Sequence, residues 1–302
     1  MKITRSSTLP IFFAWAVVLL VSLLPTVLLQ EIFHRPVSPD QYAVFLLAVI
    51  GAALVVAFAW RPLRVLLPFL ALFGVFVGGR WLVYNRIDTL GRYPAWLANS
   101  SFSVSMLAEQ SLNLMVTLLV IGALLLMGRR PRDFYLAKGD HNAPAEPIRW
   151  MGVRPGDRWG RFGLILTLCI SLGTLIFLVL AGRPPLDIVV RALPFLPAIL
   201  LAAALNGFTE EVSYKAAFLS ILENPVGPRQ ALYMVAFYFG VAHYYGVPYG
   251  IVGVILATFL GWILAKSMQE THGLAWAWFI HFWQDVWIFS FMAIGSIVPG
   301  GG

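Results

Sequence analysis

The sequence contains few charged residues. Only 12% of its 302 residues are Asp, Glu, Lys or Arg, and 60% are hydrophobic, whereas a soluble domain has roughly 25% charged residues. Such a chain cannot cover a water-facing surface, which excludes an ordinary cytosolic enzyme and a secreted globular domain. Disorder is also excluded, since it needs low hydrophobicity and many charges. The composition predicts an integral membrane protein.

Cysteine and the common catalytic motifs are also scarce or absent. Cys169 is the only cysteine, so no disulfide and no cysteine-based metal site can form within the chain. The sequence has no H-E-x-x-H and no G-x-S-x-G, the patterns of many zinc proteases and serine hydrolases. Zinc held by His243, His281 and a glutamate stays an alternative, but the spacing disfavours it, so no cofactor is expected.

Long apolar runs are what the sequence has in excess. A membrane-spanning helix needs about 20 apolar residues, and nine runs approach this length. The sequence therefore predicts an all-α, polytopic transmembrane bundle with about nine spans. The third and seventh runs are short, and eight spans with a re-entrant third run is the alternative. The runs cover residues 9–29, 42–60, 63–77, 106–127, 162–180, 192–213, 231–244, 249–265 and 275–297.

Lysine and arginine are distributed unequally between the two sides of this bundle. If the N-terminus is cytoplasmic, fifteen of them lie on the cytoplasmic side and six on the other, as the positive-inside rule requires. This topology explains most of the net charge of +7, so nucleic-acid binding is not predicted. The expected location is the plasma (inner) membrane, with the lipid bilayer as surroundings.

The chain divides into three regions. Residues 1–127 hold four spans without a recognised motif, and residues 128–161 form a basic, proline-containing cytoplasmic loop. Residues 162–302 hold five spans and nearly all of the ionisable residues that interrupt apolar runs. Such residues are costly in a bilayer and are functional candidates by default.

The first polar cluster is Glu210-Glu211-Val-Ser-Tyr214-Lys215. On a helix, Glu211 and Lys215 are four residues apart in the favourable order for an ion pair. Glu210 lies about 100° further round the helix, beside Tyr214 rather than Lys215. Glu210 is therefore the less neutralised acid and the better candidate for a general base. The alternative is that both acids only mark a helix end at the membrane surface.

Two further clusters lie on later spans. Phe239 and His243 are four residues apart, as are His281 and Asp285, so Asp285 is expected to orient the imidazole of His281. The three clusters can meet only around a polar cavity. A dry site with general acid–base and oxyanion-stabilising groups fits hydrolysis of an acyl or peptide bond by an activated water.

These motifs resemble the CPBP family of intramembrane proteases (CAAX proteases and bacteriocin-processing enzymes, also called Abi). The family pattern is E-E-x-x-x-R, F-x-x-x-H and H-x-x-x-N/D on successive helices. Here it reads Glu210-Glu211 to Lys215, Phe239 to His243, and His281 to Asp285. Lys215 stands where arginine is usual, and Asp285 where asparagine is commoner.

The resemblance implies a metal-free glutamic endopeptidase. Glu210 would activate the attacking water with help from His243, and His281 and Asp285 would polarise the scissile carbonyl. Glu211 would be the auxiliary acid, and Lys215, Tyr214 and Phe239 would support the site. The substrate would be a membrane-associated or lipid-modified peptide or protein.

Two other functions remain as alternatives. One is a non-catalytic membrane scaffold or immunity-type relative, and the other, which the motif order disfavours, is a proton-coupled transporter. At 1.5 Å per residue, Glu210 lies about 27 Å along its helix from Ala192, near the cytoplasmic end of the 192–213 run. The site is therefore expected to open toward the cytoplasm.

Overall fold

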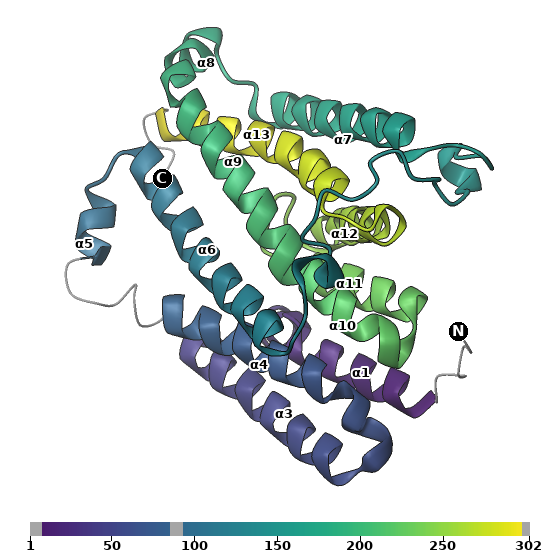
Figure 1. Ribbon diagram of the computed structural model, residues 1–302. Helices are drawn as coiled ribbons and strands as arrows, with labels where there is room; N and C mark the ends of the chain where they lie inside the picture. Colours follow the sequence, from purple (N-terminus) through teal and green to yellow (C-terminus); the bar gives the residue numbers. More distant parts are fainter. Residues whose placement is uncertain (1–7, 85–92, 298–302) are drawn as a thin grey trace.

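The computed structural model describes residues 8–84 and 93–297, and these residues form helices and connecting segments without any β-strand (Figure 1). The prediction of an all-α membrane protein is confirmed. Six helices in this part of the chain are long and apolar enough to cross a membrane, or seven if the bent pair Thr8–Val21 and Leu24–Ile32 counts as one span. The predicted number of nine stays a prediction.

The front half of the bundle contains α1 to α6. A 49° bend separates α1 from Leu24–Ile32, where the first run was expected to be one helix. Helix α3 packs against α1 and α4, and it begins at a capping box of Ser38 and Gln41 with Pro39 at its first position, a combination that favours helix initiation. The helices are α1 (Thr8–Val21), α2 (Leu24–Val27), α3 (Pro39–Ala59), α4 (Leu67–Leu82), α5 (Tyr93–Ala98) and α6 (Phe102–Leu126).

The back half contains α7 to α13. Its helices are α7 (Trp159–Gly182), α8 (Leu186–Ala192), α9 (Leu196–Glu210), α10 (Ala217–Val226), α11 (Pro228–Ala242), α12 (Ile251–Thr271) and α13 (Ala275–Ile297). Two of the predicted spans correspond to helices that are less typical of a membrane. The helix α11 has only 15 residues, and α13 carries the polar residues His281, Gln284 and Asp285.

The helix that carries the two glutamates is longer than expected. A π-helical turn, Glu211–Ala216, joins α9 to α10 without interruption. At 1.5 Å per residue, Glu210 lies about 21 Å from Leu196 and about 24 Å from Val226. The prediction that Glu210 lies near the end of its helix is wrong, because the helix continues beyond residue 213.

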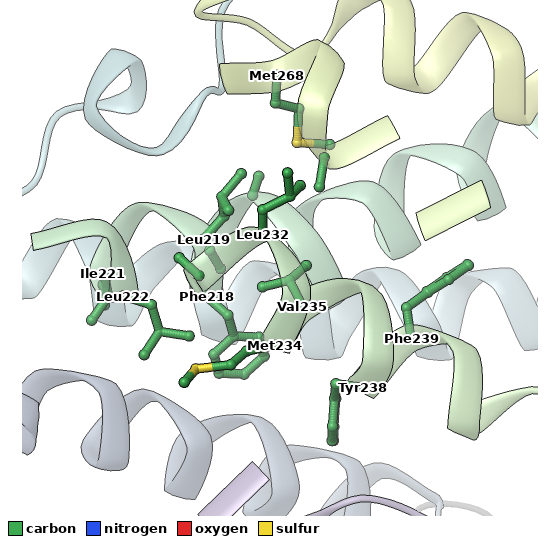
Figure 2. Packing of buried hydrophobic residues seen from close by; sticks show 14 of the residues in the cluster. Phe218, Leu219, Ile221, Leu222, Leu232, Met234, Val235, Tyr238, Phe239 and Met268 are labelled. Carbon is green, nitrogen blue, oxygen red and sulfur yellow. The ribbon is translucent and has the colours of Figure 1, made fainter. Parts of the chain in front are cut away.

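An aromatic cluster joins the two halves of the bundle. The ring of Phe218 on α10 lies 4.5 Å from Phe73, 5.7 Å from Phe76 and 6.2 Å from Phe69, all on α4. Tyr238 on α11 closes the cluster, 5.2 Å from Phe73. Figure 2 shows Tyr238 and its neighbour Phe239 leaving α11 on different sides. One buried core therefore runs through both halves.

The segment between α6 and α7 is folded against the ends of other helices. Leu274 donates its backbone N–H to the carbonyl of Ala137, and Asp140 donates to the carbonyl of Thr271. The indole of Trp159 donates to Glu270 at 2.7 Å, and Lys266 forms an ion pair with Glu146. The hydrogen bond and the charge of Lys266 hold the pKa of Glu146 below its usual range. This basic segment marks one end of the bundle.

Candidate active site

The centre of the site is the carboxylate of Glu211. Glu211 and Lys215 are both fully buried, and Lys215 Nζ donates to Glu211 Oε1 at 2.7 Å, so the ion pair expected from the sequence is present. The same oxygen accepts a hydrogen bond from His281 Nδ1 at 2.6 Å. A buried carboxylate with two such donors is held in one position and ionised.

The imidazole of His281 is oriented by Glu211 and not by Asp285 as expected. Its other nitrogen, Nε2, lies 3.6 Å from Asp285 Oδ1 and 3.6 Å from Glu210 Oε2, too far for a good hydrogen bond. Asp285 is instead held by Asn206, whose side-chain amide donates to Oδ2 at 3.0 Å. Two carboxylates therefore face the nitrogen Nε2.

Glu210 is the acid without a fixed partner. Its Oε2 is buried and has no hydrogen-bond partner among the described residues. The π-helical turn that follows Glu210 is rare in proteins, and such turns are frequent at functional sites. Glu210 and Glu211 are therefore adjacent in sequence but differ in their surroundings, as the sequence predicted.

The ring of Phe239 contacts Lys215, His243 and His281. Lys215 Nζ lies 3.3 Å from the centre of the Phe239 ring, a cation–π contact. The ring of His243 lies 4.4 Å away and that of His281 6.2 Å away. His243 Nδ1 lies 2.8 Å from the backbone carbonyl of Phe239. Since a carbonyl only accepts, Nδ1 carries the proton and Nε2 is free to accept one.

Tyr214 packs among aromatic rings of both halves of the bundle, with its ring 6.2 Å from that of Phe239. Its ring lies 5.0 Å from Phe76 and 6.0 Å from Tyr238, and the guanidinium of Arg80 lies 5.9 Å from its centre. Among the described residues it makes no hydrogen bond to Glu210. Tyr214 and Glu210, which were predicted to be neighbours, therefore line the same cavity without a direct hydrogen bond.

A cavity of about 210 Å³ lies next to Glu210. Of the eight residues that the sequence singled out, only Glu210 and Tyr214 line it. Helices α4 and α6 supply a large part of its wall, although no motif was recognised in residues 1–127. These front-half residues could have been found in the sequence as polar residues inside or beside apolar runs. Those polar residues of the front half are Arg80, Tyr84, Glu109, Asn113 and Thr117.

The cavity lies toward one end of the bundle. Tyr84 directly follows the last turns of α4, and the exposed Glu109 belongs to the first turns of α6. This is the end opposite the 128–158 segment, because α6 runs from Glu109 toward that segment (Figure 1).

A metal ion needs several ligand side chains around one point. In the described part of the chain, no group of three or more His, Cys, Asp or Glu side chains could hold one. The oxygen Oε1 of Glu211 is already in contact with Lys215 and His281.

Residues 192–287 match the family model described as Type II CAAX prenyl endopeptidase Rce1-like. The matched segment runs from the end of α8 into α13 and includes every site residue predicted from the sequence. The resemblance to the CPBP/CAAX protease family is thus confirmed, and the match supports intramembrane protease function. Searches of curated proteins and of solved structures gave no match.

Proposed function

We propose that the protein is an intramembrane endopeptidase in which Glu210 activates the water that attacks a peptide bond. The observation that carries this proposal is the state of Glu210 Oε2, which is buried, unpaired among the described residues and 3.6 Å from His281 Nε2. A carboxylate without competing donors can accept a proton from a water in the adjoining cavity.

The other acids have supporting roles in this proposal. Glu211, fixed by Lys215, holds the imidazole of His281 so that Nε2 faces Glu210 and Asp285. From there, Nε2 can donate to the oxygen of the scissile carbonyl as negative charge develops on it. Lys215, which stands where arginine is usual in the family, pairs with Glu211 through a single ammonium group.

His243 assists the proton transfers. Because Nδ1 donates to the carbonyl of Phe239, Nε2 is the basic nitrogen and can accept a proton from the water or return it to the leaving amine. Phe239 sets the position of His243 relative to His281 through its ring contacts with both.

The proposed substrate is a membrane-associated or lipid-modified peptide or protein, and the reaction needs no cofactor. We expect membranes that contain the protein to release peptides with new chain ends, and we expect the release to persist in EDTA and 1,10-phenanthroline. Mass spectrometry of the released peptides measures both, with Glu210→Gln membranes as the control. If no ends depend on the protein, or if chelators abolish them, the proposal fails.

We also propose nine spans in a plasma (inner) membrane, with a cytoplasmic N-terminus. The structure buries Lys215 and places Arg80 beside the cavity, but the remaining lysines and arginines still favour the end that carries residues 128–161 as cytoplasmic. The cavity lies toward the other end. In this orientation the site faces the extracytoplasmic side, a revision of the cytoplasmic opening expected from helix depth.

Cysteine labelling tests this orientation. In a Cys169→Ala background, Glu109→Cys marks the cavity end and Arg154→Cys marks the opposite end, and both native side chains are exposed. A membrane-impermeant thiol reagent is expected to label Glu109→Cys in intact cells, and Arg154→Cys only in inverted vesicles. The reverse pattern would show that the N-terminus is extracytoplasmic.

A further inference from the structure

The guanidinium of Arg80 lies among aromatic rings, and the carboxylates of Glu109 and Glu210 line the same cavity without forming an ion pair with it. Its Cζ atom is 5.0 Å from the ring centre of Tyr84 and 5.9 Å from those of Phe76 and Tyr214. In the described ranges, 8–84 and 93–297, Arg80 forms no ion pair and no hydrogen bond. A half-buried arginine is usually paired, whereas the five N–H donors of Arg80 have no acceptor among the described residues and can bind a ligand.

Arg80 stands between two cavities. One is the cavity of about 210 Å³ beside Glu210, and the other, of about 260 Å³, extends between α3, α4 and α11. Four residues line both cavities: Phe76, Arg80, Tyr84 and Tyr214. The second cavity has mainly apolar and aromatic walls, including Leu23, Tyr42, Leu46 and Val77.

We propose that Arg80 and the second cavity bind a carboxylate that is attached to an apolar group of the substrate. The planar guanidinium fits a carboxylate through two parallel hydrogen bonds. The apolar cavity beside it buries the attached side chain, in the combination of apolar walls and few polar groups that ligand sites have. The carboxylate is either the free C-terminus after an apolar residue or an acidic side chain next to one.

This site fixes the position of the substrate relative to Glu210. Since Arg80 and Glu210 line the same cavity, a peptide held by its carboxylate places a peptide bond only a few residues away against Glu210. This step rests on the proposed function, whereas binding itself does not. Arg80 lies on α4, outside the segment 192–287 that matches the family model.

The test measures binding to the full chain carrying Glu210→Gln, so that no cleavage occurs. The probes are N-acetyl-trileucine with a free carboxylate, its C-terminal amide, and N-acetyl-leucyl-aspartyl-leucine amide. Calorimetry in detergent gives their affinities. We expect at least one carboxylate probe to bind about 10- to 100-fold more tightly than the neutral amide, the range of a hydrogen-bonded charge pair. The stronger of the two identifies the source of the carboxylate.

Substitution of Arg80 decides whether this residue is responsible. Arg80→Gln, added to Glu210→Gln, is expected to remove the preference for a carboxylate and to leave the affinity for the neutral amide unchanged. Arg80→Lys is expected to retain part of it. Arg191→Gln, which changes an exposed arginine on α8, is the control and keeps the preference.

Three results would overturn the proposal. The first is equal binding of all probes to the chain with Arg80 intact, and the second is a preference that survives Arg80→Gln. The third is that dihexanoyl phosphatidylglycerol binds more tightly to the chain with Arg80 than to the Arg80→Gln variant, while neither peptide carboxylate does. In that case the site binds a lipid phosphate. Because no cleavage is measured, each of these counts against the Arg80 site alone.

Discussion

Glu210→Gln is expected to lower the rate of peptide cleavage by about 10²- to 10⁴-fold, the usual contribution of a general base. Glutamine has nearly the same shape as glutamate but cannot take a proton from water. Because Glu210 Oε2 has no partner to lose among the described residues, the variant is expected to fold normally. Single-turnover kinetics on a peptide released from membranes measures the rate.

Two controls make this result specific. Asp187→Asn removes an exposed carboxylate from α8 and is expected to cleave at the wild-type rate. The thermal midpoint of Glu210→Gln is expected to match that of the wild type, which excludes loss of folded protein as the cause. Cleavage by Glu210→Gln at the wild-type rate would show that Glu210 is not the general base, and the proposed mechanism would fail.

Lys215→Met is expected to destabilise the protein strongly. It leaves the fully buried Glu211 without its ammonium partner, and breaking a buried pair in this way costs about 3–5 kcal/mol. The variant also loses the cation–π contact with Phe239. Thermal unfolding in detergent is expected to show a midpoint lower by roughly 10 °C, given about 2–4 °C per kcal/mol for a chain of this size range.

The matched control is an ion pair with the same spacing on the surface. Arg191 and Asp187 are also four residues apart, but their side chains are 57% and 71% exposed. Exposed pairs contribute about 0–1 kcal/mol, so Arg191→Met is expected to leave the midpoint nearly unchanged. Lys215→Arg keeps the charge, and its thermal midpoint is expected to lie between those of Lys215→Met and Arg191→Met. Equal midpoints for Lys215→Met and Arg191→Met would contradict the buried pair.

The sequence predicted the contacts that depend on local spacing. Glu211 with Lys215, and Phe239 with His243, are each four residues apart on a helix, and helical geometry alone brings such residues together. The apolar composition was likewise enough for the membrane class. These predictions needed no knowledge of how distant helices pack.

Contacts between distant helices could not be predicted. Asp285 is four residues from His281, but the packing of α13 against α9 brings Glu211 to the imidazole. For the same reason, Arg80 could not be predicted as a site residue. Its place at the cavity depends on how α4 packs against the back half. The sequence also predicts too early an end for the helix through Glu210. The charges of Glu211 and Lys215 are typical of a helix end at the membrane surface, but in the structure they neutralise each other inside the bundle.

Helices α4 and α6, which form part of the cavity wall, can change the ligand specificity of such proteins. The groups proposed to move protons lie within the segment matched by the family model, whereas Arg80, Glu109 and Asn113 lie outside it. Exchange of residues on α4 can therefore alter which ligand is admitted without touching the groups that do the chemistry. By the same reasoning, the matched segment is not an independent module. Without the front half it would lose the aromatic cluster around Phe218 and one wall of the cavity beside Glu210.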